Sequence, residues 1–562
     1  MRPLTTHNDP RVAADAHFDA VVVGSGFGGS VTAFRLAEAG LSVCLLERGR
    51  AYPPGSFPRR PGEMARNFWD PSKGLQGLFD VWSFRGLGGI VASGLGGGSL
   101  LWSNVVLRKD ASTFVREEGE YWPVTYEELE PHFEAHEQML GATPYPFDRP
   151  PYDKTYKTKA MQYASQELEL EWFLPKLAVA FDPGDGRPRL GQPLLGEENL
   201  HGRGRLTCVL CGECNVGCNY GSKNTLDFNY LSLAKLRHGA DIRTRCEVKT
   251  FAPRDGGGFV VDYVDHAEAP EGPRERDLPL HRLTTDRLVL SAGSFGTTYL
   301  LLKNRDAFPR LSSRLGTRFC GNGDLLTFGL RAREDGRPRP VDGSYGPVIT
   351  STVRVKDAAE GGPGRAYYIQ DGGQPVFVNW IIESSHQLAV FRRALRLLLR
   401  LKWKLLRLDR RSDIGDEIAS FFNSDLTATS MPFFSMGRDL PNGTMRLTKE
   451  GWLDVDWRKR KGDPPFDDIR ATAKRMADTL EAKFVDNPSW HLSRVVTVHP
   501  VGGCPMGRDE GEGVVDSYGR VFGYPGLTIA DGSVLPGPVG PNPSTTIAAL
   551  AHRFAERTIA EA

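Results

Sequence analysis

The sequence predicts an α/β fold that opens with a β-strand, a helix and a second strand, on three observations near the N-terminus. Residues 18–23, "FDAVVV", form a short β-branched run of the kind found in buried parallel strands. Three glycines in the pattern G-x-G-x-x-G follow, and an amphipathic stretch continues from them. A second apolar run, "LSVCLLE", ends in the acid Glu47. This order predicts a Rossmann-like unit that binds a dinucleotide.

The glycines and the acid each have a physical task in such a unit. Gly24 permits the tight turn, Gly26 lets the backbone approach a pyrophosphate, and Gly29 lets the helix pack closely on the strand. The start of the helix offers free N–H groups and the positive end of its dipole to the phosphates. Glu47 stands at the distance at which an acid binds a ribose hydroxyl. These features do not separate NAD from FAD.

Size and composition limit the function classes. A chain of 562 residues can bury more than one core, and a net charge of +1 gives no overall attraction to nucleic acid. The first twenty residues lack the apolar centre of a secretory signal, and no apolar run is long enough to cross a bilayer. We therefore expect a cytoplasmic protein, and peripheral contact with the inner face of the membrane stays open.

Further motifs indicate FAD and a family. Residues 86–104, "GLGGIVASGLGGGSLLWSN", expose backbone amides that pass close to a flat ligand, which an ordinary NAD dehydrogenase does not need. Near the C-terminus come "HPVGG" from His499 and "DGSVLPGPVGPNPSTTIAALA" from Asp531. With the N-terminal fingerprint, these motifs resemble the glucose–methanol–choline (GMC) family of FAD-dependent oxidoreductases, in its cholesterol-oxidase-like actinobacterial branch.

The resemblance implies a fold of two domains. One is a discontinuous Rossmann-like FAD-binding domain made of residues 17–110, 220–325 and 490–562. The other is an α+β substrate domain with an antiparallel sheet, made of residues 111–219 and 326–489. The arrangement is that of the GMC and p-hydroxybenzoate-hydroxylase-like folds.

The resemblance also implies the residues that hold FAD. The ADP half would be held by Gly24, Gly26, Gly29 and Glu47, with the backbone of Val248 at the adenine. The pyrophosphate and the isoalloxazine would be lined by Gly97, Gly98, Ser99 and Asn104. The segment that returns to the flavin domain would contribute Ala292. The remaining contacts would come from Asp531 and Gly532 at the pyrophosphate–ribityl region and from Asn542 and Pro543 at the pyrimidine edge.

The implied catalytic pair is His499 and Asn542. An imidazole has a pKa near neutrality, so His499 could take the hydroxyl proton while hydride leaves for flavin N5. Asn542 would orient the same hydroxyl. Cholesterol oxidases of this fold also use an acid from a substrate-domain loop, and Glu383 is one possible position, although a solvated loop acid fits it equally well.

We therefore expect FAD-dependent oxidation of a hydrophobic alcohol to the carbonyl compound, with a 3β-hydroxysteroid as one candidate substrate. Oxygen or another acceptor would take the electrons. An alternative on the same scaffold is a flavin-dependent lyase of the fatty-acid photodecarboxylase or hydroxynitrile-lyase type. A third is a flavoprotein without catalysis.

Residues 386–411, "HQLAVFRRALRLLLRLKWKLLRLDRR", predict a basic amphipathic helix. One reading is an interfacial helix with its basic face among anionic headgroups. The other is a surface helix whose apolar face packs on the substrate domain. Nucleic-acid binding is disfavoured, because no aromatic stacking platform accompanies the charge.

The stretch 208–218, "CVLCGECNVGC", has the spacing C-x2-C-x2-C-x3-C of a bacterial ferredoxin loop. Cys208, Cys211, Cys214 and Cys218 are therefore candidate metal ligands for an iron–sulfur cluster. Asn219 stands where a proline usually follows in ferredoxins. Free thiols and a disulfide stay open as alternatives.

Overall fold

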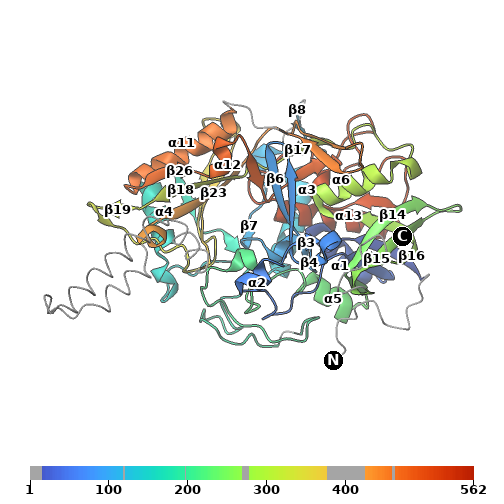
Figure 1. The fold of residues 1–562 in the computed structure, drawn as a ribbon, viewed down its shortest axis with the longest axis horizontal. Coiled ribbons are helices and arrows are strands. Elements are labelled where there is room, and N and C mark those ends of the chain that lie inside the picture. The colour runs from blue at the N-terminus through green and yellow to red at the C-terminus, as the bar shows by residue number, and fades with distance from the viewer. Residues whose placement is uncertain are drawn as a thin grey trace.

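A computed structural model describes residues 16–114, 116–117, 120–196, 198–268, 278–375, 425–457 and 463–562 (Figure 1). The N-terminal strand lies inside a seven-stranded sheet. The order of six of its strands is β13 (Asp241–Thr244), β2 (Val43–Glu47), β1 (His17–Val23), β16 (Leu280–Leu290), β15 (Phe259–Asp265) and β14 (Cys246–Pro253). The seventh strand, β29 (Leu527–Ile529), pairs with β16.

The centre of this sheet is parallel and buried, as the apolar runs predict. β1 runs parallel to both β2 and β16, and all residues of β2 are buried. Strands β14 and β15 extend the sheet as an antiparallel pair. The predicted Rossmann-like unit is confirmed.

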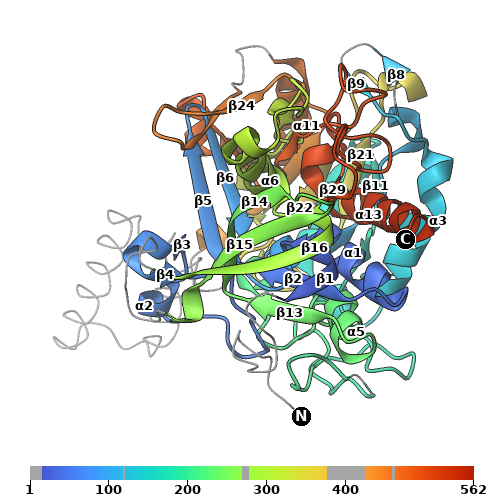
Figure 2. The same cartoon turned by 90° about the vertical axis from the view of Figure 1, so that its right-hand side faces the viewer.

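Helices cover this sheet and make the first core. Figure 2 shows α1, α3 and α13 grouped together beside β1 and β2. The helices around the sheet are α1 (Phe27–Glu38), α3 (Tyr126–Met139), α5 (Tyr230–Leu236), α6 (Gly293–Lys303) and α13 (Ser544–Ala560). Helix α13 contacts both α1 and α3, so the C-terminal helix packs on the N-terminal βαβ unit.

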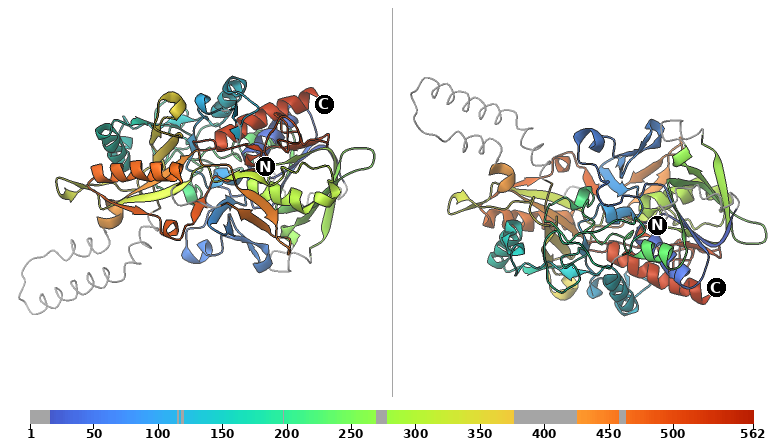
Figure 3. Two further views of the ribbon diagram at one scale, coloured as in Figure 1. Left: turned by 90° about the horizontal axis from the view of Figure 1, so that it is seen from above. Right: turned by 90° about the horizontal axis from the view of Figure 1, so that it is seen from below.

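The second sheet has six strands, and every neighbouring pair is antiparallel. Its order is β11 (Glu171–Phe173), β21 (Thr352–Val355), β22 (Tyr367–Asp371), β23 (Met431–Gly437), β18 (Leu325–Leu330) and β26 (Lys483–Asp486). Helices α4 (Tyr156–Glu167) and α11 (Pro464–Thr479) pack on it around a second core. In Figure 3, α11 (orange) and α13 (red) lie toward opposite ends of the molecule. The predicted antiparallel sheet with helices is confirmed.

A smaller three-stranded sheet lies between these two parts. It consists of β5 (Phe79–Phe84), β6 (Leu87–Ala92) and β27 (Val495–Thr497). The shorter helices are α2 (Pro61–Met64), α10 (Asp425–Ala428) and α12 (Pro488–His491). The shorter strands are β3 (Trp69–Asp70), β4 (Leu75–Gln76), β7 (Val105–Val106), β8 (Arg116–Glu117), β9 (Glu120–Tyr121), β10 (Thr143–Pro144), β12 (Lys176–Leu177), β17 (Thr317–Cys320), β19 (Arg333–Glu334), β20 (Arg337–Pro338), β24 (Thr444–Leu447), β25 (Leu453–Asp456) and β28 (Val501–Gly503).

Candidate active site

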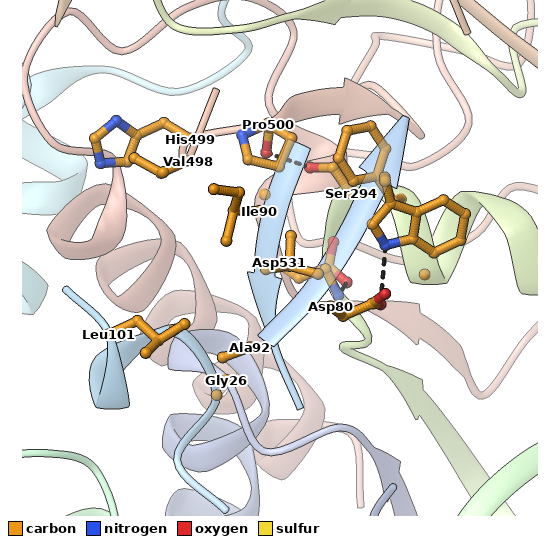
Figure 4. A pocket seen from close by; sticks show the side chains of 18 of the residues that line it. Gly26, Asp80, Ile90, Ala92, Leu101, Ser294, Val498, His499, Pro500 and Asp531 are labelled. Atoms are coloured by element: carbon orange, nitrogen blue, oxygen red, sulfur yellow. Dashed lines mark hydrogen bonds between the residues drawn. The ribbon is translucent and has the colours of Figure 1, made fainter. Parts of the chain in front are cut away.

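A cavity of about 1030 Å³ is lined by residues of both large sheets. The first sheet contributes the turns after β1 and β2, the second contributes β18 and β23, and β6 supplies part of the wall. In Figure 4, Gly26 and Leu101 lie on one side, His499 and Pro500 lie on the other, and Ile90 stands between them. Most of the residues predicted for FAD and for catalysis line this cavity.

The glycine turn after β1 forms one end of the cavity. Gly24 has φ +97°, and a Cβ on it would lie 2.3 Å from the carbonyl oxygen of Ser291. Helix α1 starts after Gly26, and no side chain caps its first amides. Those amides are free to bind a phosphate at the positive end of the helix dipole.

Two further glycines allow close packing behind this turn. A Cβ on Gly29 would lie 2.0 Å from the carbonyl oxygen of Gly24, so Gly29 serves the contact of helix and strand and does not line the cavity. A Cβ on Gly28 would lie 1.5 Å from the carbonyl oxygen of Ala530. Gly28 was missed in the sequence because only the three-dimensional structure brings the end of β29 against α1.

Glu47 lines the cavity at the end of β2 and is nearly fully buried. Its carboxylate accepts hydrogen bonds from the backbone N–H (3.1 Å) and hydroxyl (2.6 Å) of Ser25 and from the Gly49 N–H (2.7 Å). Burial raises the pKa of Glu47, and these donors act in the opposite direction. The acid therefore braces the glycine turn, and its remaining lone pairs suit a ribose hydroxyl.

The second glycine-rich loop meets the first. Gly97 and Gly98 line the cavity, and a Cβ on Gly97 would lie 2.6 Å from the Cα of Gly26. Ser99 and Asn104 differ from the expectation, because neither lines the cavity. Both are fully buried, and Ser99 donates 2.7 Å to a carbonyl oxygen of its own turn. They lie behind the loop.

The remaining predicted cofactor residues reach the cavity from segments far apart in the sequence. They are Val248 on β14, Ala292 at the start of α6, and Asp531, Gly532 and Pro543 after β29. Asp531 connects two of these segments, because its carboxylate accepts from the Gly293 N–H (2.9 Å) and the Thr297 hydroxyl (2.5 Å). Burial raises the pKa of Asp531.

His499 lines the cavity and is oriented by Asp324, which sequence reasoning missed. His499 Nδ1 lies 2.7 Å from Asp324 Oδ1, and Asp324 Oδ2 accepts from the backbone N–H of Val498 (2.8 Å) and of His499 (3.1 Å). Since an ionised carboxylate only accepts hydrogen bonds, Nδ1 carries the proton. In the neutral ring Nε2 then keeps its lone pair and serves as the base.

Asn542 lines the same cavity and is oriented by Gln370 on β22. Gln370 is fully buried, and its Nε2 donates to Asn542 Oδ1 over 3.0 Å. The carbonyl end of the Asn542 amide is thereby engaged, which leaves its Nδ2 hydrogens as donors. The cavity thus offers an acceptor on His499 and a donor on Asn542.

The wall next to the second sheet is apolar. Its side chains come from β7, β18, β23 and the residue that follows β27, among others. They include Leu101, Val105, Leu325, Leu326, Ile349, Phe434, Met436 and Val498. Such a wall favours a hydrophobic ligand with few polar groups.

The four clustered cysteines line a separate small cavity. All eight cysteines have free thiols, so the clustered four form no disulfide. Across the described ranges, no group of three or more His, Cys, Asp or Glu side chains is placed to hold a metal ion.

Two predictions fall outside the described residues, namely Glu383 as the substrate-loop acid and the basic helix at 386–411. Within the described residues, no helix has the length and apolar character needed to cross a membrane.

Comparison with known proteins agrees with the fold. Residues 440–551 match the GMC oxidoreductase family, and residues 22–56 match the NAD(P)-binding Rossmann-like domain. The chain is 29% identical to a cholesterol oxidase of Mycobacterium tuberculosis (96% of this chain, 90% of that one). It is 28% identical to a cholesterol oxidase of Acinetobacter baumannii (95% and 93%). A solved structure of pyridoxine 4-oxidase from Mesorbium loti shares the fold with a TM-score of 0.58, 15% identity and coverage of 96% and 98%.

A Rossmann-like unit, an antiparallel second sheet and a cavity lined by both define a protein of the dinucleotide-binding class. The family match and the oxidase relatives indicate that it is an oxidoreductase. The chain is similar to the GMC oxidoreductases at residues 440–551 and to cholesterol oxidases over nearly its whole length, so it resembles the cholesterol-oxidase-like branch of that family.

Proposed function

We propose that the chain oxidises a hydrophobic alcohol to the carbonyl compound, with FAD as the hydride acceptor. The observation that carries this proposal is the pair of oriented polar groups, His499 Nε2 and Asn542 Nδ2, on a cavity whose other walls are glycine loops and apolar side chains. An acceptor and a donor on the wall of one cavity suit a hydroxyl group, which both donates and accepts.

The FAD-binding residues in this proposal are those on the cavity wall. The glycine turn and the start of α1 would take the pyrophosphate, Glu47 the ribose, and Asn542 with Pro543 the pyrimidine edge. Uncapped amides at α1 and the two touching glycine loops support this fit. Residues 17–110, 220–325 and 490–562 would form the FAD domain, with 111–219 and 326–489 as the substrate domain.

In the reaction, the alcohol hydroxyl donates to His499 Nε2 and accepts from Asn542 Nδ2. Asp324 holds the proton of His499 on Nδ1 and faces the imidazolium after the substrate proton has moved. Gln370 holds the orientation of the Asn542 amide, so that the Nδ2 hydrogens of Asn542 can stay hydrogen-bonded to the substrate oxygen while the alcohol becomes a carbonyl. Bound FAD supplies N5 as the acceptor of the hydride.

A sterol-like substrate is the finer part of the proposal. The relatives named as cholesterol oxidases and the apolar wall support it. Oxygen is one acceptor for the electrons. Membrane contact through 386–411 and a cytoplasmic location stay predictions from the sequence.

The test is anaerobic mixing of the purified flavoprotein with alcohols in the dark. A long-chain or 3β-hydroxysteroid alcohol is expected to remove the absorbance of oxidised flavin and to yield the carbonyl product. Flavin that stays oxidised with every alcohol would contradict the proposal. Light-dependent decarboxylation or cyanohydrin cleavage by the same sample would instead identify the lyase alternative.

A further inference from the structure

One turn of the chain contacts both of the segments that carry His499 and Asn542. It consists of residues 321–324, it joins β17 to β18, and all four of its residues are buried. Asp324, at the end of the turn, makes the contact with His499 that is described above. Asn322, two positions earlier, makes the contact with the segment before Asn542.

Asn322 uses both ends of its side-chain amide on residues 539–541. Its Oδ1 accepts from the backbone N–H of Val539 (2.8 Å) and of Gly540 (3.2 Å). Its Nδ2 donates to the carbonyl oxygen of Pro541 over 3.0 Å. One fully buried amide group therefore holds three successive residues, where little water competes for the hydrogen bonds.

The backbone of Asn322 suits this task. Its φ is +54°, in the left-handed region, where asparagine is several-fold enriched among residues with a side chain. The carbonyl oxygen of Asn322 accepts from the Gly437 N–H over 3.0 Å, which ties the turn to the end of β23. The Asn322 side chain therefore starts from a fixed place.

The position of Asn542 depends on the residue before it. Asn542 stands between Pro541 and Pro543. A proline has a fixed φ, and the residue before a proline has few allowed conformations. The backbone of this segment therefore has little freedom to compensate for a displaced Pro541 carbonyl. A hydrogen bond that fixes this carbonyl also fixes the point from which the Asn542 side chain extends.

The same turn is tied to the strand that precedes His499. Thr497, on β27, is fully buried, and its Oγ1 lies 3.1 Å from the carbonyl oxygen of Gly321 and 2.9 Å from Asp324 Oδ2. A displacement of the turn would consequently move the contacts of His499 and of Asn542 together. The turn thus sets the relative position of the acceptor and the donor.

A second contact holds the segment before Asn542 from another part of the chain. Lys109 is fully buried, and its Nζ donates to the carbonyl oxygens of Pro538 and Val539, both over 3.4 Å. This Nζ also lies 4.5 Å from the ring centre of Trp122. The segment therefore stays attached to the fold without the Asn322 side chain, so the loss of that side chain should shift the segment rather than unfold it.

We propose that Asn322 is a positioning residue for the alcohol oxidation, which holds the Asn542 donor in a fixed place relative to His499 Nε2. This inference rests on the proposed function. Gln370 sets the direction of the Asn542 amide, whereas Asn322 sets the place of the backbone that carries it.

The first test is hydrogen–deuterium exchange of the full-length, flavin-bound protein without substrate. The prolines of the segment have no N–H. A peptide that covers 538–543 therefore reports three amides, those of Val539, Gly540 and Asn542. Two of these amides donate to Asn322.

Asn322→Gly removes the side chain and still permits the left-handed backbone. Exchange in this peptide should become about tenfold faster, because two amides lose their acceptor. Asp335→Gly, at an exposed position with φ +51°, is the matched control and should leave the exchange unchanged. Exchange that is as slow in Asn322→Gly as in the parent would overturn the proposal.

The second test is a double-mutant cycle with Asn542→Ala. Asn322→Gly alone should lower kcat by about tenfold, the upper end for one neutral hydrogen bond, and KM should change less. In a chain that already carries Asn542→Ala, it should lower kcat by less than about twofold, because the group that it positions is gone. A further tenfold loss in that background would overturn the proposal, since Asn322 would then act through another group.

Asn322→Asp covers the case in which Asn322→Gly fails to fold. At pH 9 the ionised carboxylate still accepts from both amides but cannot donate to the Pro541 carbonyl. Exchange should then stay slow while kcat falls by about two- to tenfold, and a kcat equal to that of the parent would overturn the proposal. A parent protein whose flavin no alcohol reduces would refute the proposed function, whereas the exchange of 538–543 would still test the hold of Asn322 on the segment.

Discussion

His499 and Asn542 form the alcohol side of the large cavity, and their partners differ in charge. His499 bonds to the carboxylate of Asp324, whereas Asn542 bonds to the neutral amide of Gln370. A hydrogen bond to a charged group contributes about 1.5–3 kcal/mol, and one between neutral groups about 0.5–1.5 kcal/mol. The comparison therefore indicates that the proposed reaction depends more on the partner of His499 than on the partner of Asn542.

The largest expected effect comes from removing the base on the alcohol side. His499→Ala should lower the rate of anaerobic flavin reduction by about 10²- to 10⁴-fold, the usual contribution of a positioned general base. Flavin content should not change, because the glycine loops that would hold FAD are untouched. His238→Ala, at an exposed position, is the control. Equal rates for the two variants would remove His499 from the mechanism.

The next effect tests the partner of that base. Asp324→Asn should lower the same rate by about ten- to a hundredfold, the cost of losing a charged hydrogen bond of about 1.5–3 kcal/mol. The asparagine amide can donate to Nδ1 and move the ring proton to Nε2, which then cannot act as a base. Asp324→Glu should recover part of the rate by restoring a carboxylate. If it is as slow as Asp324→Asn, loss of packing explains the effect better than loss of charge.

A smaller effect is expected at the other partner. Gln370→Leu removes a neutral hydrogen bond worth about 0.5–1.5 kcal/mol, so kcat should fall by about two- to tenfold. KM should change less, because the Asn542 donor matters most as the carbonyl forms. Steady-state kinetics under saturating acceptor separates the two parameters. A rise in KM with unchanged kcat would show that Gln370 only shapes the cavity.

The last expected effect concerns the free energy of unfolding and not the reaction rate, and it comes from a buried acid near Asp324. Asp439 is fully buried and accepts from the Gly321 N–H over 2.9 Å. Burial raises its pKa to about 7. The folded state therefore holds a proton that the unfolded chain releases near pH 4, so stability from this group falls as the pH rises from about 4 through about 7.

Asp439→Asn should remove this pH dependence and stabilise the protein above pH 7 by up to about 4 kcal/mol. Denaturant unfolding at pH 5 and pH 8 measures it, with Asp478→Asn on the exposed face of α11 as control. A variant with the same slope between these pH values as the parent would contradict the assignment.

The sequence predicted those features that depend on local order. The βαβ unit follows from apolar runs and glycines within thirty residues, and the motifs around His499 and Asn542 mark both as site residues. Their partners lie far away in the chain, because Asp324 is 175 positions from His499 and Gln370 is 172 positions from Asn542. No local sequence pattern predicts a hydrogen bond between residues so far apart.

The contact between Gly28 and Ala530 has a consequence for how the protein matures. The floor of the cavity closes only when β29 and the turn after it dock against α1, and these segments lie about five hundred residues apart in the sequence. During synthesis, the glycine turn before α1 leaves the ribosome long before β29 and the turn that follows it. The cofactor is therefore expected to enter after translation is complete, and a nascent chain should not retain it.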